Sequence, residues 1–100
     1  MAVRLSDRAI YELGDILQWY ESVADLSVAA TMEGRFWDAF RRIGDGLLVG
    51  SRRIAWLSDP YRFVMMDPYW IIWRPEGRAR LVVAILHSRR DIPRLLLGLD

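Results

Sequence analysis

The chain has 100 residues, of which 53% are hydrophobic and 27% are charged, and its formal net charge is +1. This composition is typical of one globular domain and excludes an intrinsically disordered chain. The absence of cysteine excludes disulfides and thiolate metal sites, and the charged N-terminal residues and short apolar runs argue against a signal peptide and a membrane span. We therefore expect a single cytoplasmic domain over residues 1–100, without a membrane partner.

Charge is unevenly distributed along the chain. Residues 1–50 carry five arginines against eight acidic residues, a balance of −3, whereas residues 51–100 carry nine arginines against five acids, a balance of +4. All 14 basic residues are arginine, whose planar guanidinium suits bidentate contacts with carboxylates or phosphates. A high-arginine genome accounts for the absence of lysine but not for the segregation, which allows partners of opposite sign to dock on different faces.

Two amphipathic helices are predicted in the first half of the chain. Ser6 is a suitable N-cap for a helix over about residues 7–23. Its apolar stripe comprises Ile10, Leu13, Ile16, Leu17 and Tyr20. Asp25 or Ser27 can cap a second helix, which ends at Gly44 or Gly46. The second stripe comprises Val28, Met32, Phe36, Ala39, Phe40 and Ile43. The short connection predicts an antiparallel helical hairpin.

The second half of the chain changes to a strand-like pattern. Residues 45–60 are ambiguous and predict a loop with one turn or a short strand. Three runs rich in aromatic and β-branched residues follow, at 61–66, 69–74 and 80–87, separated by turn residues. Short connections make neighbouring strands antiparallel, so we expect a three- to four-stranded antiparallel sheet. The last strand is almost wholly apolar and is expected to be covered on both faces.

A short C-terminal helix is predicted over Ile92–Leu97, with Asp91 as its N-cap, Pro93 in its first turn and Gly98 at its end. The predicted order is two helices, three strands and a final helix, which makes an α+β domain with the hairpin packed on the small sheet. Five tryptophans are many for this length. Most are expected in the core, with one or two exposed as anchors for a protein partner.

The run "LVVAILHSRRDIP" (residues 81–93) ends in a polar cluster that holds the only histidine of the chain. His87 is a candidate general acid or base, with Arg89 and Arg90 as a phosphate clamp. In the structural alternative, the His87 ring satisfies a backbone carbonyl, one arginine pairs with a carboxylate of the hairpin, and Asp91 caps the last helix. We favour a structural histidine because no triad spacing is visible, and one histidine without cysteine also argues against a metal site.

Arginines and aromatic residues are interleaved along the predicted strands. The set comprises Arg62, Arg74, Arg78 and Arg80 with Tyr61, Tyr69, Trp70 and Trp73. This combination is typical of a surface that stacks bases and binds phosphates of single-stranded nucleic acid. Simple alternation, with one strand face packed on the helices and the other in water, predicts the same pattern without a ligand, and we favour it. No phosphate-binding glycine loop, nucleotide motif or nucleophile elbow is present.

The order of elements and the segment "IIWRPEGRARLVVAILHSRRDIPRLL" resemble the RelE/ParE toxin superfamily of bacterial type II toxin–antitoxin systems. The ParE-like branch carries a strand of the form IxYR, a turn, a strand ending in histidine, and then xRRDIPxLL. Here the corresponding residues are 72–74, the turn 75–77, and 87–96. The resemblance covers essentially the whole chain and is most specific over 70–97. It implies a helical hairpin paired with a small antiparallel sheet.

The resemblance implies two alternative functions. RelE-like members are ribosome-dependent mRNA endonucleases that use a basic cluster with a tyrosine or histidine, whereas ParE-like members lack that set and poison DNA gyrase by protein–protein contact. This chain has no lysine and no tyrosine after Tyr69, and Ser88 follows His87 where some nucleases have tyrosine. We therefore expect a ParE-like toxin that is not an enzyme and needs no cofactor. In the nuclease alternative, His87 is the base and Arg62 and Arg89 are the clamps.

A cognate antitoxin is also implied by the family. A small meander exposes an edge strand to which a disordered tail can add a strand, and an amphipathic helix can lie across the hairpin. An acidic tail would suit the half of the chain with a balance of +4. The residues expected to bind partners are Arg74, Arg78, Arg80, Arg89, Arg90, Arg94 and Trp70. A third alternative is a non-toxic, degenerate family member that acts as a binding module.

Overall fold

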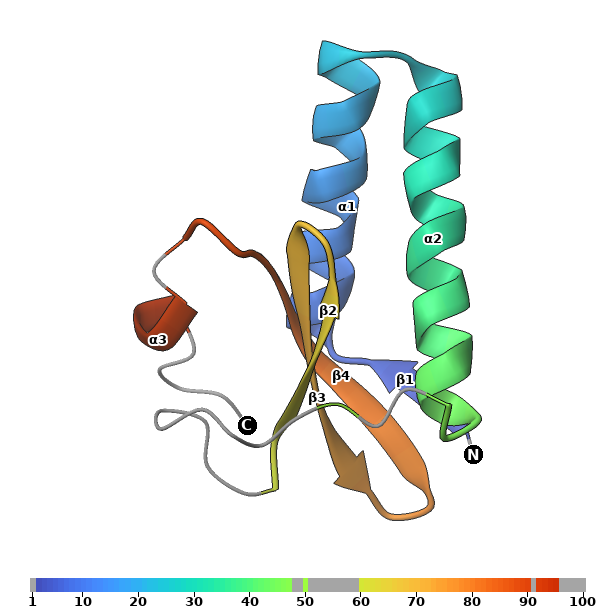
Figure 1. The fold of residues 1–100 in the computed structure, drawn as a ribbon, viewed down its shortest axis with the longest axis vertical. Helices are drawn as coiled ribbons and strands as arrows, with labels where there is room; N and C mark the ends of the chain where they lie inside the picture. The colour runs from blue at the N-terminus through green and yellow to red at the C-terminus, as the bar shows by residue number, and fades with distance from the viewer. Residues whose placement is uncertain (1, 48–49, 51–59, 91, 96–100) are drawn as a thin grey trace.

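A computed structural model describes residues 2–47, 50, 60–90 and 92–95 (Figure 1). The elements in chain order are β1 (Ala2–Leu5), α1 (Asp7–Val23), α2 (Leu26–Gly44), β2 (Arg62–Met66), β3 (Tyr69–Glu76), β4 (Ala79–His87) and α3 (Ile92–Leu95). α1 and α2 form the predicted antiparallel hairpin, which packs on a four-stranded sheet of order β1-β4-β3-β2. Figure 1 shows that the connected ends of the two helices rise well beyond the sheet.

The start of each long helix is set by a side-chain cap. Ser6 caps α1 as predicted, because its Oγ accepts a hydrogen bond from the Ala9 amide at 3.1 Å. Of the two candidates for α2, Asp25 is the cap. Its carboxylate accepts hydrogen bonds from the Ser27 hydroxyl at 2.7 Å and the Val28 amide at 2.9 Å. These two bonds, the first above all, hold the pKa of Asp25 below its usual value, so the carboxylate stays ionised.

The sheet is mixed, so the prediction of a purely antiparallel sheet is wrong. β2, β3 and β4 form the predicted antiparallel meander, but β1 pairs with β4 in parallel, with Ala2 opposite Ala79 and Leu5 opposite Val82. We assigned no strand to residues 2–5 because four residues carry too little periodicity to identify one. Their partner strand also lies at the other end of the sequence, where local patterns carry no information about pairing.

The three predicted strands begin and end within two residues of their expected positions. β4 is buried along most of its length, which confirms that both of its faces are covered. Val82 and Ile85 face the hairpin, whereas Val83 and Ala84 both face the opposite side. The pairing of β3 with β4 skips Val83, and this bulge explains why two successive side chains share one face.

Apolar clusters cover both faces of the sheet. The larger one joins the hairpin to the sheet and includes the fully buried Phe36, Phe40, Ile43, Ile71 and Val82. The smaller one, on the other face, comprises Ile72, Val83, Ala84, Leu86 and Ile92, with half-buried residues around them. Two of the predicted stripe positions, Ile10 and Val28, are exposed and do not belong to either cluster, because they lie at the margins of the helix faces that meet the sheet.

β1 ends opposite Val82. From there on, Ser6 and a side chain of α1 bond to the edge of β4 in place of a strand. The Ser6 amide donates to the Val82 carbonyl at 2.9 Å, and the Ser6 hydroxyl donates to the Val83 carbonyl at 3.2 Å. Further along α1, Glu12 Oε1 accepts a hydrogen bond from the Ile85 amide at 3.0 Å. These contacts matter because a buried peptide group left unpaired costs about 1–3 kcal/mol.

α3 is a single helical turn that contacts α1, since the Arg8 guanidinium donates a hydrogen bond to the Leu95 carbonyl. One turn does not establish the longer C-terminal helix predicted to Leu97, which stays a prediction. Its proposed cap Asp91 and its proposed end Gly98 lie outside the described residues. Most of the ambiguous segment 45–60 lies outside them as well.

Ser6→Ala should lower the free energy of unfolding by about 2 kcal/mol, because it removes both the N-cap of α1 and the hydrogen bond to Val83. Urea denaturation measures the change. Ser22→Ala is a matched control in the same helix, since the Ser22 hydroxyl donates only to the Gln18 carbonyl on an exposed surface. The control should change the free energy of unfolding by less than about 0.5 kcal/mol. Equal effects of the two substitutions would contradict the role given to Ser6.

Gly50→Ala should destabilise the protein by about 2 kcal/mol, because Gly50 has φ +88° and an added Cβ would overlap the Phe63 carbonyl oxygen of β2. Gly34→Ala is the control, since an added Cβ at Gly34 in α2 meets nothing within 4 Å. It should stabilise the helix by up to about 1 kcal/mol. Thermal unfolding compares the two variants, and a Gly50→Ala variant as stable as the parent would show that residue 50 does not lie against β2.

Candidate functional site

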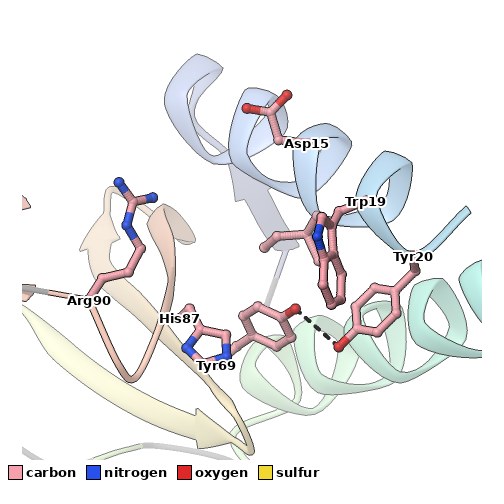
Figure 2. A pocket seen from close by; sticks show the side chains of 7 residues that line it. Asp15, Trp19, Tyr20, Tyr69, His87 and Arg90 are labelled. Atoms are coloured by element: carbon pink, nitrogen blue, oxygen red, sulfur yellow. Dashed lines mark hydrogen bonds between the residues drawn. The ribbon is translucent and has the colours of Figure 1, made fainter. Parts of the chain in front are cut away.

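A groove of about 450 Å³ lies between α1 and the adjoining ends of β3 and β4 (Figure 2). We call it the α1 groove. Its lining residues are Asp15, Ile16, Trp19, Tyr20, Tyr69, His87 and Arg90. The first four share one face of α1 because they follow helical spacing. Figure 2 shows Asp15 on α1 and Arg90 on the chain after β4, with the aromatic rings lower in this view. The groove therefore has an aromatic floor and a rim with one charge of each sign.

Sheet register places the two ring-bearing strand residues together. Tyr69 begins β3 and His87 ends β4, and the two are directly opposite each other in the antiparallel pair. Their rings meet edge to face, with centroids 5.4 Å apart. On the helix side, Trp19 and Tyr20 also meet edge to face, with centroids 5.0 Å apart. Such contacts favour a defined arrangement of the rings.

A hydrogen bond between two tyrosines closes the base of the groove. The Tyr69 hydroxyl donates to the Tyr20 hydroxyl at 3.1 Å and thereby ties β3 to α1 (Figure 2). Tyr69 is only 4% exposed. Its burial, and then its contact with Tyr20, raise the pKa of Tyr69 above its usual value, so the phenol stays protonated at neutral pH. Tyr69 therefore contributes an uncharged phenol to the floor of the groove.

The His87 ring takes part in the turn that follows β4. Its Nδ1 accepts a hydrogen bond from the Arg89 amide at 3.1 Å, so the neutral ring carries its proton on Nε2. The prediction that the ring satisfies a carbonyl is wrong, because the turn brings a backbone N–H to the ring instead. The Arg90 amide donates a hydrogen bond to the His87 carbonyl at 3.0 Å and so closes the same turn. The Ser88 amide donates to the Pro68 carbonyl at 2.8 Å.

The three residues of the nuclease alternative do not come together. His87 and Arg89 lie at the end of β4, opposite Tyr69 of β3. Arg62 lies opposite Trp73, four residues further along β3, which places it about 13 Å away along the sheet. Its guanidinium lies 5.9 Å from the centroid of the Trp73 ring. Arg62 therefore cannot clamp a phosphate that is held at His87 without a large rearrangement.

The arginines predicted to bind partners fall into two groups at opposite ends of β4. One group follows His87 and comprises Arg89, Arg90 and Arg94. The other flanks the turn between β3 and β4 and comprises Arg74, Arg78 and Arg80. Because β4 has nine residues, Arg89 and Arg90 lie about 26 Å along the strand from the turn between β3 and β4. Arg94 lies in α3, which contacts α1. Within the described residues, neither Arg89 nor Arg90 forms the predicted ion pair with a carboxylate of the hairpin.

Two arginines of the second group support the fold. Arg80 Nη1 donates to the Ile43 carbonyl at the end of α2 at 2.7 Å, and its guanidinium lies 4.8 Å from the Trp73 ring centroid. It thus offsets the helix dipole and makes a cation–π contact. Arg74 lies 3.3 Å from a carboxylate oxygen of Glu76. Arg78 is the exposed member of this group.

The aromatic residues of the strands do not form one stacking surface. Tyr69 and Trp73 belong to the cluster under the hairpin, whereas Tyr61 and Trp70 lie on the opposite face, where Trp70 stacks on Phe63. This division is what alternation predicts, and it argues against a nucleic-acid platform. Of the four tryptophans in the described part of the chain, Trp19 and Trp37 are exposed, at 56% and 52%, and only Trp73 is buried, so the prediction that most tryptophans lie in the core is not confirmed.

The α1 side of the groove was missed in sequence analysis. The sequence feature that indicates this side of the groove is Trp19, a large apolar residue that falls outside the predicted apolar stripe of its helix. Among the residues that the structure describes, no three His, Asp or Glu side chains gather in a way that could hold a metal ion. Over the same residues, no helix is both long and apolar enough to cross a membrane.

Comparison with known proteins identifies the family of this chain. A family model described as "ParE toxin of type II toxin-antitoxin system, parDE" matches residues 3–92. A chain in the solved structure "Chromosomal ParDE TA system from P. aeruginosa" has the same fold, with a TM-score of 0.73 and 13% identity over 89% of this chain and 97% of that chain. No curated protein matches this sequence significantly. Since the family match spans nearly the whole chain, this chain belongs to the ParE toxin family of type II toxin–antitoxin systems.

Proposed function

We propose that this chain is a toxin that inhibits DNA gyrase by protein–protein contact and is neutralised by a cognate antitoxin. The family match supports a toxin with an antitoxin partner. The separation of Arg62 from His87 is the observation that favours binding over RNA cleavage. General acid–base cleavage needs a base, an acid and a phosphate clamp within reach of one substrate, and His87 with Arg89 supplies only part of that set.

The α1 groove is the proposed antitoxin site. Its aromatic floor suits apolar side chains, and Trp19 is an exposed anchor of the kind that carries much of the affinity at protein interfaces. At the rim, the Arg90 guanidinium suits a carboxylate and the His87 Nε2–H suits an oxygen acceptor. Because Asp15 carries the opposite charge on the other rim, the groove favours one direction of a bound segment.

The exposed arginines outside the groove are the proposed contacts to gyrase. Arg89 is exposed next to the rim residue Arg90, Arg94 is exposed on α3, and Arg78 is exposed at the far end of β4. Arg74, Arg80 and Trp70 are half-buried and take part in contacts within the fold, so we give them a supporting role. These exposed arginines lie at separate places on the molecule, and none of them lines the apolar groove.

Purified toxin should inhibit DNA supercoiling by gyrase, and expression without the antitoxin should stop growth. His87→Ala should retain both effects, because the proposal gives the ring no part in bond cleavage. Supercoiling assays and growth curves, with translation followed by amino-acid incorporation, measure the outcome. Cleavage of ribosome-bound mRNA that depends on His87 would instead indicate a RelE-like nuclease. Full growth of cells that express the parent protein would indicate a non-toxic binding module.

Trp19→Ala should weaken antitoxin binding by about 10- to 100-fold, because it removes the anchor of the groove. Trp37→Ala is a matched control. Trp37 is 52% exposed against 56% for Trp19, and it also meets a neighbouring ring edge to face, but it does not line the groove. Its substitution should change the affinity by less than about threefold. Calorimetry with the purified antitoxin tests this, and equal losses for the two variants would place the antitoxin elsewhere.

A further inference from the structure

The connected end of the helical hairpin has no sheet against it. Figure 1 shows this end rising beyond the strands. The buried residues of α1 are Ala9 and Leu13, both in its first half, so the second half of the helix contains none. We call residues 21–33 the hairpin tip. It comprises the last residues of α1, the connection, and the first turns of α2.

The hairpin tip lies within the most acidic part of the chain. Between residues 9 and 34 there are five acidic residues and no arginine, whereas the rest of the chain has 14 arginines against eight acids, a balance of +6. Of the five acids, Glu12 is bound to β4 and Asp15 lines the groove. The other three, Glu21, Asp25 and Glu33, are exposed on the tip.

The dipoles of α1 and α2 add to the negative charge of the hairpin tip. The C-terminal end of α1 carries a partial negative charge, and no basic side chain occupies its last turn to offset it. The N-terminal end of α2 carries a partial positive charge, but the Asp25 carboxylate caps it. The two dipoles therefore leave the tip with a net negative contribution, and the side chains of Glu21 and Glu33 add to it.

Apolar side chains are exposed at the same place. Val23 is the last residue of α1, and Leu26 is the first of α2. Both are more than half exposed, with Leu26 at 68%, and Val28 beside them is also exposed. Single exposed apolar residues are ordinary, but three within six positions of one another around one connection form a patch rimmed by acids.

We propose that the hairpin tip is a second docking surface, separate from the α1 groove, that binds a basic amphipathic segment of a partner protein. The acids select a segment rich in lysine or arginine, and the apolar residues select a helix with one apolar face. The same acids repel nucleic acid phosphates and anionic lipid, which disfavours those two partners. This surface goes beyond toxin activity and antitoxin binding, since the tip shares no residue with the lining of the α1 groove.

The test uses the purified full chain and a synthetic helical peptide of about 18 residues, with leucine on one face and lysine on the other. A second peptide with glutamate in place of lysine is the charge control. Binding is followed by NMR chemical shifts of the backbone amides, which report both affinity and location. The lysine peptide should bind, with shifts concentrated at residues 21–33, and the glutamate peptide should bind at least about tenfold more weakly.

Variants separate the apolar and the charged contributions. Leu26→Ser should weaken binding about tenfold, whereas Leu47→Ser, at a residue of similar exposure (64% against 68%) far from the tip, should have no effect. The double variant Glu21→Gln/Glu33→Gln should weaken binding roughly fivefold and flatten its dependence on salt. Asp25 is kept because it caps α2.

Three results would overturn the proposal: no binding of the lysine peptide, equal affinity for both peptides, or shifts confined to the groove. A second copy of this chain, with its arginines against the tip, is the other partner to test. Sedimentation velocity of the free protein tests for it. Association of the free protein that increases with concentration and is abolished by Leu26→Ser would assign the tip to self-assembly and likewise overturn the proposal. A monomeric free protein that binds the lysine peptide at the tip supports it.

Discussion

The outer edge of β4 is the constraint on which the rest of the structure depends. β1 covers this edge only to Val82, and the peptide groups beyond it need other partners. Ser6 and Glu12 supply them from α1, through hydrogen bonds to the Val83 carbonyl and the Ile85 amide. Because both residues sit at defined positions of one helix, these bonds set where α1 crosses the sheet. The α1 groove follows from that crossing, since it opens where α1 passes the ends of β3 and β4.

Arginine serves opposite purposes at the two ends of β4. Near the turn between β3 and β4, Arg80 donates to the Ile43 carbonyl at the end of α2 and lies over Trp73, so its guanidinium makes its contacts within the fold. After His87, Arg90 stands at the rim of the groove and Arg89 points into solvent, where a partner can reach them. The chemistry of the guanidinium is the same in both places. What differs is whether backbone carbonyls and a ring already surround it.

Surfaces of different chemistry follow one another along the long axis of the molecule. The basic end holds the β3–β4 turn, the middle holds the aromatic groove with one charge of each sign, and the acidic hairpin tip lies beyond the sheet. A small toxin that must meet both an antitoxin and a target gains from such a division, because surfaces of different chemistry recognise different partners. Family membership supports the existence of partners, and the geometry suggests which surface suits each kind.

Local patterns in the sequence were sufficient for the helical hairpin, the cap at Ser6 and the three strands of the meander, because capping and apolar periodicity act over a few neighbouring residues. The resemblance around "HSRRDIPRLL" also pointed to the family. Only the tertiary structure decided the parallel pairing of β1, the separation of Arg62 from His87 and the position of Trp19 and Tyr69 around one groove. Each of these joins residues far apart in the chain, and their distances depend on strand register and helix crossing, which no local pattern encodes.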